Sequence, residues 1–172
     1  MRPLGHTSGP AIDWKRDDTM TTVTVESQVA APVTQVFEVF TDLEHGAEHV
    51  SNIQKIEVLT TGGFSLGTRW RETREVMGHL DSAEIEVTAF ERNHTYTITH
   101  HKAGTRIDAV FTFEPSQTGT KVRIAFALDS HGLPPGLLAP LMWASAGKVR
   151  EVLSGDLADL KAFVETLSAQ PA

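Results

Sequence analysis

The sequence predicts one α+β domain, in which a seven-stranded antiparallel sheet packs against a long C-terminal helix. Two patterns carry this prediction. Segments with the period-two alternation of strands recur at hairpin spacing, and the apolar positions from about Pro140 to Leu167 recur at spacings of three and four. The connections between the strand-like segments are too short for parallel crossovers, so neighbouring strands must run antiparallel.

The elements follow one another in a simple order. The segment TTVTVESQV, residues 21–29, alternates cleanly and predicts the first strand. Helical spacing follows, with Pro32 suited to a first helical turn, and Gly46 divides this run into two short helices. Six further strands are expected at about 53–60, 68–77, 82–91, 95–102, 105–114 and 120–129. Turn-forming residues lie between them.

The chain of 172 residues fits a single domain. Residues 1–20 mix proline, glycine and charges without a period, so we expect a flexible leader there and one domain at 21–170.

Composition excludes several classes of function. The chain has no cysteine, which excludes disulfides, cysteine-ligated zinc and a thiol nucleophile. A formal net charge of -7 with scattered basic residues argues against a nucleic-acid partner. No window approaches about 18 consecutive apolar residues, and the first residues lack an apolar signal segment, so a cytoplasmic protein without a transmembrane segment is expected. No phosphate loop or nucleophile elbow is present, and no cofactor is expected.

One predicted strand carries charge on both faces. In GTRWRETREVMG, residues 67–78, alternation places Trp70, Glu72 and Arg74 on one face and Arg69, Arg71 and Glu75 on the other. If the tryptophan face turns toward the long helix, Glu72 and Arg74 enter a cavity, where each partners the other and leaves polar atoms free for a ligand. Alternatively, strand twist or a bulge turns this pair to a wet opening, or the two side chains only pair with each other.

Alternation on the neighbouring strands points further side chains inward. Ile85, Tyr96, His100, Phe111 and Phe126 are among them, and Val58 is expected on the same face. Tyr96 and His100 are the polar exceptions. They are suited to orienting a carbonyl or moving a proton, or they form only structural hydrogen bonds.

Two histidines have the spacing of a metal-binding pair. His45 and His49 would share one face of a helix, but Gly46 weakens the helix there and no motif supplies a third ligand. We therefore expect no metal site.

The segment LPPGLLAPLMWASAG, residues 133–147, is the most apolar in the chain. Its side chains, Met142 included, have three interpretations: a gate for an apolar ligand, a homodimer contact, or plain burial of the helix start. Pro140 is expected to limit how early the helix begins.

The sequence resembles the START/Bet v1-like superfamily, also called SRPBCC, and within it the bacterial polyketide cyclase/dehydrase-like proteins. The resemblance covers residues 20–168 and rests on VTVESQVAAPVTQVFEVFTDLEH, GTRWRETREVMG, AEIEVTAFERNHTYTI and GDLADLKAFVE. It implies a helix-grip fold, in which a curved antiparallel sheet wraps around the C-terminal helix and leaves a cavity between them.

Three functional hypotheses follow. The first is a protein that binds a small, largely apolar molecule, such as a polyketide-like, aromatic or lipid ligand. Its expected ligand contacts are Trp70, Glu72, Arg74, Ile85, Tyr96, His100, Phe111, Phe126, Met142 and Val149. Replacing Arg74 would then weaken binding with little change in stability. The second, which the resemblance permits, is a cyclase or dehydratase with Glu72, Arg74, Tyr96 and His100 as catalytic candidates. The third is a protein-interaction module that acts through residues 137–143.

Overall fold

The computed structural model describes residues 22–76, 78–102, 104–130 and 135–169; within these ranges the side chains at 22, 76, 129–130 and 135–145 are not described. The elements are β1 (Thr22–Val29), α1 (Val33–Phe40), α2 (Gly46–His49), β2 (Ile53–Val58), β3 (Arg69–Val76), β4 (His79–Glu91), β5 (Thr95–Lys102), β6 (Thr105–Ser116), β7 (Gly119–Ser130) and α3 (Pro135–Ala169). The expected leader and residues 170–172 lie outside the described residues.

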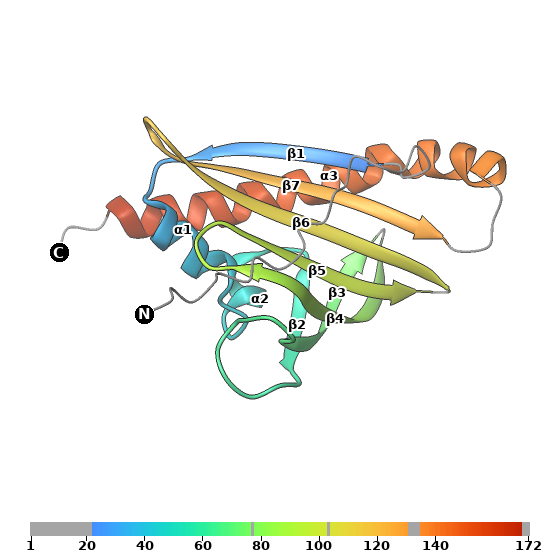
Figure 1. Cartoon of the computed structure of the whole chain (residues 1–172), viewed down its shortest axis with the longest axis horizontal. Coiled ribbons are helices and arrows are strands. Elements are labelled where there is room, and N and C mark those ends of the chain that lie inside the picture. The colour runs from blue at the N-terminus through green and yellow to red at the C-terminus, as the bar shows by residue number, and fades with distance from the viewer. Residues whose placement is uncertain (1–21, 77, 103, 131–134, 170–172) are drawn as a thin grey trace, which may run out of the picture.

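The seven strands form one antiparallel sheet in the order β1-β7-β6-β5-β4-β3-β2. The first strand pairs with the last, with Val29 opposite Thr120, so β1 lies beside the end of the β2–β7 meander. Helix α3 runs along the sheet, and the short helices α1 and α2 lie near its C-terminal half (Figure 1). The predicted fold class, a curved antiparallel sheet around a long C-terminal helix, is confirmed.

An aromatic cluster joins α1 to the sheet. The ring of Phe37 packs edge-on against Phe113 of β6 at a centroid distance of 5.2 Å, and Phe40 does the same at 5.3 Å. Leu157 and Val164 of α3 are also buried in this core. The predicted apolar stripes on α1 and α3 therefore meet on the concave face of the sheet.

The turn between β6 and β7 requires glycine. Gly119 has a φ of 135°, and a Cβ atom there would lie 2.2 Å from the carbonyl oxygen of Val29. The absence of a side chain lets this hairpin approach the end of β1 closely.

Several boundaries differ from the sequence-based prediction. Helix α3 begins at Pro135, so Pro140 lies inside the helix and does not delay its start; proline has the φ of a first helical position, and Pro135 occupies it. Strand β4 begins at His79, three residues before the expected start, because it pairs with β3 as far as Val76. Val58, expected to point inward, is 43% exposed, because it ends the edge strand β2.

Among the helices that the described ranges contain, none combines the length and apolar character needed to span a bilayer.

Candidate functional site

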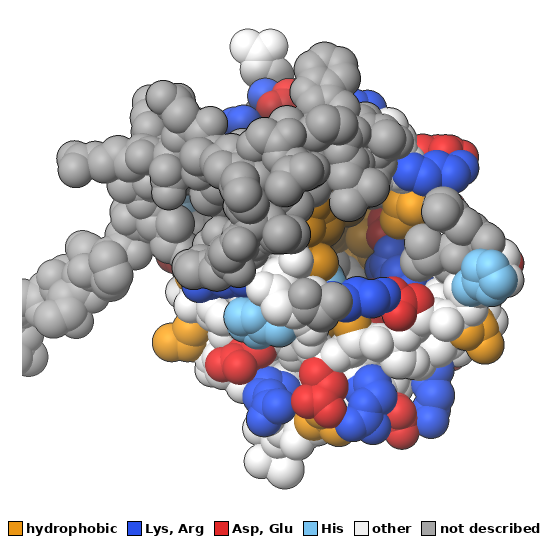
Figure 2. All heavy atoms as spheres, turned by 90° about the vertical axis from the view of Figure 1, so that its right-hand side faces the viewer, with side chains coloured by type: hydrophobic (Ala, Val, Ile, Leu, Met, Phe, Trp, Pro, Cys, Tyr) orange, Lys and Arg blue, Asp and Glu red, His pale blue; other side chains and the backbone are white. Residues whose placement is uncertain are grey.

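A cavity of about 120 Å³ lies between the concave face of the sheet and the helices. Its wall is formed by Val39, Phe40, Asp42, Leu43, Gly46, Val50, Ile53, Ile56, Phe64, Trp70, Glu72, Arg74, Tyr96, Ile98, Phe111, Ile124, Leu153, Asp156 and Leu160. Most of these side chains are apolar. Viewed from the end of the molecule at the right of Figure 1, the surface is hollowed, and hydrophobic side chains lie there beside acidic and basic ones (Figure 2).

Aromatic rings build one side of this wall. Tyr96 stacks on Phe111 at a centroid distance of 4.6 Å, and Phe64 packs edge-on against Tyr96 at 5.0 Å. Phe64 comes from the connection between β2 and β3, and it also lies 6.1 Å from Trp70. Phe64, a loop residue, therefore extends the aromatic part of the cavity wall that the strand residues form.

An ion triad interrupts the apolar wall. The Arg74 guanidinium donates from Nε to Glu72 Oε1 at 2.7 Å and from Nη1 to Asp156 Oδ2 at 2.9 Å. Trp70 Nε1 donates to the second oxygen of Glu72 at 3.4 Å. The three charged side chains are 24%, 12% and 13% exposed for Arg74, Glu72 and Asp156. The ion pair between Arg74 and Asp156 therefore connects strand β3 to helix α3.

The triad carries one more negative charge than positive. Burial lowers the pKa of Arg74, but the charges of Glu72 and Asp156 outweigh burial and raise it overall, so the guanidinium stays protonated. Burial raises the pKa of Asp156, although Arg74 opposes this shift. One cation is therefore shared by two carboxyl groups.

One oxygen of the triad has no partner. Asp156 Oδ1 is buried and accepts no hydrogen bond from the described residues. The Asn52 amide is near enough to lower the pKa of this carboxyl slightly, yet it forms no hydrogen bond of ordinary geometry with Oδ1. Buried polar atoms are almost always paired. Oδ1 is itself shielded by the surrounding atoms, so Asp156 lines the cavity through its other atoms.

The polar candidates on β5 have structural surroundings. The Tyr96 hydroxyl donates to the backbone oxygen of Phe40 at 3.3 Å, and burial raises the pKa of this phenol. The hydroxyl proton of Tyr96 is therefore used in a hydrogen bond to α1, and Tyr96 contributes its ring to the cavity wall. His100 lies opposite Ile85 of β4, and burial lowers the pKa of its ring while the Glu72 charge opposes this shift. His100 is therefore neutral at pH 7.

The structure brings half of the predicted contacts together. Trp70, Glu72, Arg74, Tyr96 and Phe111 line the cavity, while Ile85, His100, Phe126 and Val149 are not part of its wall. Ile85 is fully packed in the core. Phe126 and Val149 share a face with Ile124 and Leu153, but each lies one repeat beyond the cavity along its strand or helix. The side chain of Met142, like the rest of the apolar segment 137–143, lies outside the described residues.

Sequence reasoning missed Asp156, although a signal was present. This carboxyl follows Leu153 by three positions and precedes Leu160 by four, so it lies on the apolar stripe of α3. A single charge on a buried stripe indicates a partner across the interface. Phe64 gave no such signal, because a loop residue has no periodic position.

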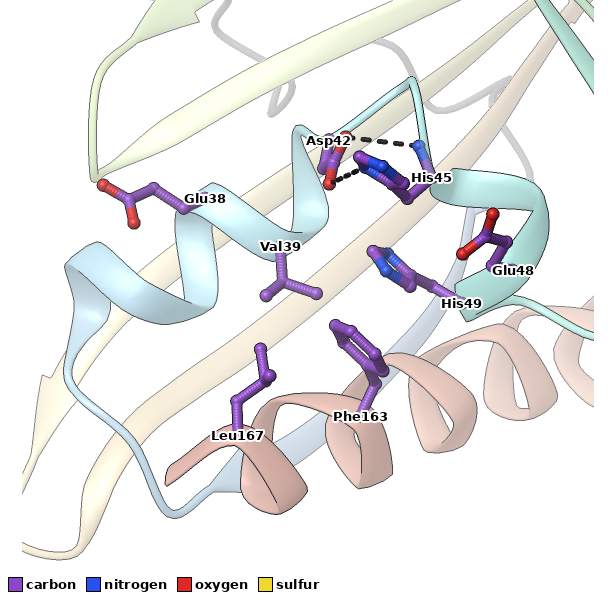
Figure 3. Close-up of a pocket in the computed structure, with 8 residues that line it drawn as sticks. All are labelled: Glu38, Val39, Asp42, His45, Glu48, His49, Phe163 and Leu167. Atoms are coloured by element: carbon purple, nitrogen blue, oxygen red, sulfur yellow. Dashed lines mark hydrogen bonds and ion pairs between the residues drawn. The ribbon is translucent and has the colours of Figure 1, made fainter. Parts of the chain in front are cut away.

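A second, open groove of about 320 Å³ lies between α1, α2 and the end of α3 (Figure 3). His45 pairs with Asp42 through Nδ1 and Oδ2 at 2.8 Å, and this hydrogen bond raises the pKa of His45. His49 stacks on Phe163 at 3.9 Å and on His45 at 6.2 Å. The two imidazoles lie face to face and do not converge on one point. Within the described residues, no group of three or more side chains is arranged as metal ligands.

Comparison with known proteins identifies the family. Residues 20–165 match the model of the family described as polyketide cyclase/dehydrase and lipid transport. The chain belongs to this family. Family membership agrees with the resemblance stated above and with the sheet, helix and cavity of this structure. No curated protein matches the chain.

Solved structures share the fold at low identity. The protein TTHA0849 from Thermus thermophilus is 22% identical with a TM-score of 0.69, covering 87% of this chain and 100% of that chain. Zhui aromatase/cyclase from a Streptomyces species is 18% identical with a TM-score of 0.69, covering 85% and 94%. Major latex-like protein 151 from Panax ginseng is 12% identical with a TM-score of 0.67, covering 84% and 97%. At these identities the likeness establishes the fold alone.

Proposed function

We propose that this protein binds a small, largely apolar molecule in the cavity between the sheet and α3. One observation carries the proposal: a buried ion triad, Glu72, Arg74 and Asp156, stands in the wall of an otherwise apolar cavity. Apolar pockets with a few convergent polar groups are the usual form of small-molecule sites, since the apolar wall provides affinity and the polar groups fix orientation.

The size of the cavity limits the ligand. A volume of about 120 Å³ is close to that of the engineered protein cavity of about 150 Å³ that holds benzene. A single-ring compound therefore fits with small side-chain movements. A larger ligand requires side chains of the wall to move, and Phe64, which comes from the connection between β2 and β3, is one that lies outside the regular strands.

Ligand binding is tested first on the purified protein. Native mass spectrometry followed by organic extraction would identify any molecule that leaves with the chain, and calorimetric titration with propylbenzene would measure uptake by the apolar wall. The expected result is saturable binding of one molecule per chain. No adduct and no uptake would refute the proposal.

Two substitutions localise the site. Ile98→Trp places an indole in the cavity and should abolish propylbenzene binding. Glu86→Trp places the same side chain on the exposed outer face of β4 and should leave binding unchanged. Binding that survives Ile98→Trp would show that the ligand lies elsewhere.

A second candidate function is catalysis of a cyclase or dehydratase type on a poly-carbonyl substrate. Two groups beside the cavity favour it, since burial raises the pKa of Asp156 and lowers that of His100. The shift of Asp156 moves its titration toward neutral pH, where proton transfer is efficient, and the shift of His100 keeps its ring neutral and able to accept a proton. Arg74 would polarise a carbonyl oxygen in the same space. The aromatase/cyclase from Streptomyces named above shares this fold and supports the same candidate.

Catalysis predicts a pH-dependent rate. Turnover of a linear poly-carbonyl thioester should depend on pH, and Asp156→Asn should remove one limb of the profile while Arg74→Lys lowers the rate. A protein that binds the thioester but returns it unchanged at every pH would be a binding protein only.

A further inference from the structure

We propose that Phe64 closes one end of the cavity and sets the largest ligand that the cavity admits. This inference rests on the proposed function, and it names the residue that decides between single-ring ligands and longer or fused-ring ones. It follows from the place of Phe64 in the chain, from its partial exposure to solvent, and from the contacts of its ring.

Phe64 lines the cavity from outside the sheet. It lies in the connection between β2 and β3, the loop at the bottom of Figure 1. The three residues before it and the three residues after it are exposed, whereas Phe64 itself is partly buried and packs against the core. Its ring therefore stands between the cavity and solvent.

The ring of Phe64 packs against three aromatic rings of the sheet. The centroid distances are 6.1 Å to Trp70, 6.0 Å to Phe90 and 5.0 Å to Tyr96. Trp70 and Tyr96 also line the cavity, and each is 3% exposed. Removing the Phe64 ring would leave space beside these two rings, because a packed core relaxes only partly into a new cavity.

Phe64 and the ion triad occupy different parts of the wall. Arg74 lies opposite Asp81, near the start of β4, whereas Phe64 lies beside Phe90, near the end of the same strand. The charged and the aromatic parts of the wall are therefore displaced from each other along β4. A ligand whose polar end is held at the triad directs its apolar end toward Phe64, and the size of that apolar end is what Phe64 limits.

The loop that carries Phe64 is held by hydrogen bonds that do not involve the ring. The Ser65 backbone nitrogen donates to Thr68 Oγ1 at 3.0 Å, and the Gly67 nitrogen donates to the carbonyl oxygen of Val87 at 2.8 Å. Thr68 is buried, and its carbonyl oxygen accepts from the Val87 nitrogen at 2.9 Å. The loop should therefore keep its path when residue 64 is changed, so a substitution there acts on the cavity.

The test measures the binding of hydrocarbons of increasing size by calorimetry on the full chain. The probes are benzene, propylbenzene, pentylbenzene and naphthalene. Wild type should bind benzene and propylbenzene, and it should bind pentylbenzene and naphthalene more weakly than propylbenzene. Phe64→Ala should bind the two larger probes about tenfold more tightly than wild type does, since each methylene that becomes buried adds about fourfold in affinity.

A second variant tests the opposite direction. Phe64→Trp places a larger ring at the same point, and it should weaken propylbenzene binding while benzene remains bound. Leu66→Ala is the matched control, because Leu66 lies in the same loop but is 66% exposed, and it should change no dissociation constant. Thermal denaturation checks that each variant folds, and Phe64→Trp decides the question if Phe64→Ala does not fold.

The outcomes separate the two proposals. A size limit that rises in Phe64→Ala or falls in Phe64→Trp, with Leu66→Ala unchanged, supports the inference. The same order of probe affinities in wild type and in both Phe64 variants overturns the inference while the proposed function stands. Wild type that binds naphthalene and pentylbenzene as tightly as propylbenzene also overturns the inference alone. No binding of any probe to wild type overturns both.

Discussion

Removing the cation of the triad should destabilise the protein strongly at neutral pH. Arg74→Met leaves the buried carboxyl groups of Glu72 and Asp156, at 12% and 13% exposure, without their shared partner. Breaking one side of a buried ion pair costs about 3–5 kcal/mol. For a chain of this length each kcal/mol corresponds to a fall in Tm of about 2–4 °C, so the expected fall is about 6–20 °C. The structure thus reverses the sequence-based expectation that Arg74 is replaceable without loss of stability.

The loss should depend on pH in one direction. Without Arg74, burial and the Glu72 charge both raise the pKa of Asp156. A carboxyl whose pKa is raised by folding leaves stability intact below its unfolded pKa of about 3.9, and stability is lost as the pH rises above that value. The difference in Tm between wild type and Arg74→Met should therefore shrink as the pH is lowered from about 7.5 to about 4.5.

Thermal and urea denaturation across this pH range measure the effect. Arg71→Met is the matched control, because Arg71 lies on the same strand in an exposed pair with Glu84 and should leave Tm nearly unchanged. The double variant Arg74→Met with Asp156→Asn should recover part of the loss. A loss of unfolding free energy below about 1 kcal/mol at about pH 7.5, or a loss of equal size at about pH 7.5 and about pH 4.5, would refute the reasoning. An unpaired buried carboxylate must lower stability at neutral pH, and protonation at low pH must relieve that loss.

Three further outcomes are expected. Tyr96→Phe should cost about 1 kcal/mol in urea denaturation through its lost bond to Phe40 and leave propylbenzene binding intact; a loss of binding would give the hydroxyl a role in the site. Burial lowers the pKa of His49, so its contribution to stability is complete above about pH 6.5 and is lost as the pH falls below that value; urea denaturation of His49→Phe should be less sensitive to acid than that of wild type, and equal sensitivity would contradict this. Gly119→Ala should cost about 2 kcal/mol or more by calorimetry, because its Cβ would overlap the backbone of Val29; a neutral effect would mean that the turn moves freely.

The candidate site was predictable to the extent that it lies on regular elements. Alternation placed Trp70, Glu72 and Arg74 together on the inner face of β3, and the structure has all three on the cavity wall. Alternation also selected Phe126, and the helical spacing of α3 selected Val149, because a periodic pattern identifies a face and not a position along it. The partner of Arg74 on the helix and the aromatic ring of Phe64 came from outside the strand pattern.

What the sequence determined by itself is the set of elements and the antiparallel pairing of neighbouring strands, since period two and period 3.6 are local properties and the connections are short. The sheet that wraps around the helix was implied by the family resemblance. The tertiary structure decided the chemistry of the cavity. Asp156 lies 82 positions from Arg74 in the chain, and Tyr96 finds its acceptor on α1. Which polar atoms are paired, and that Asp156 Oδ1 is not, depends on contacts between elements, since no local pattern encodes the distance between two side chains that only folding brings together.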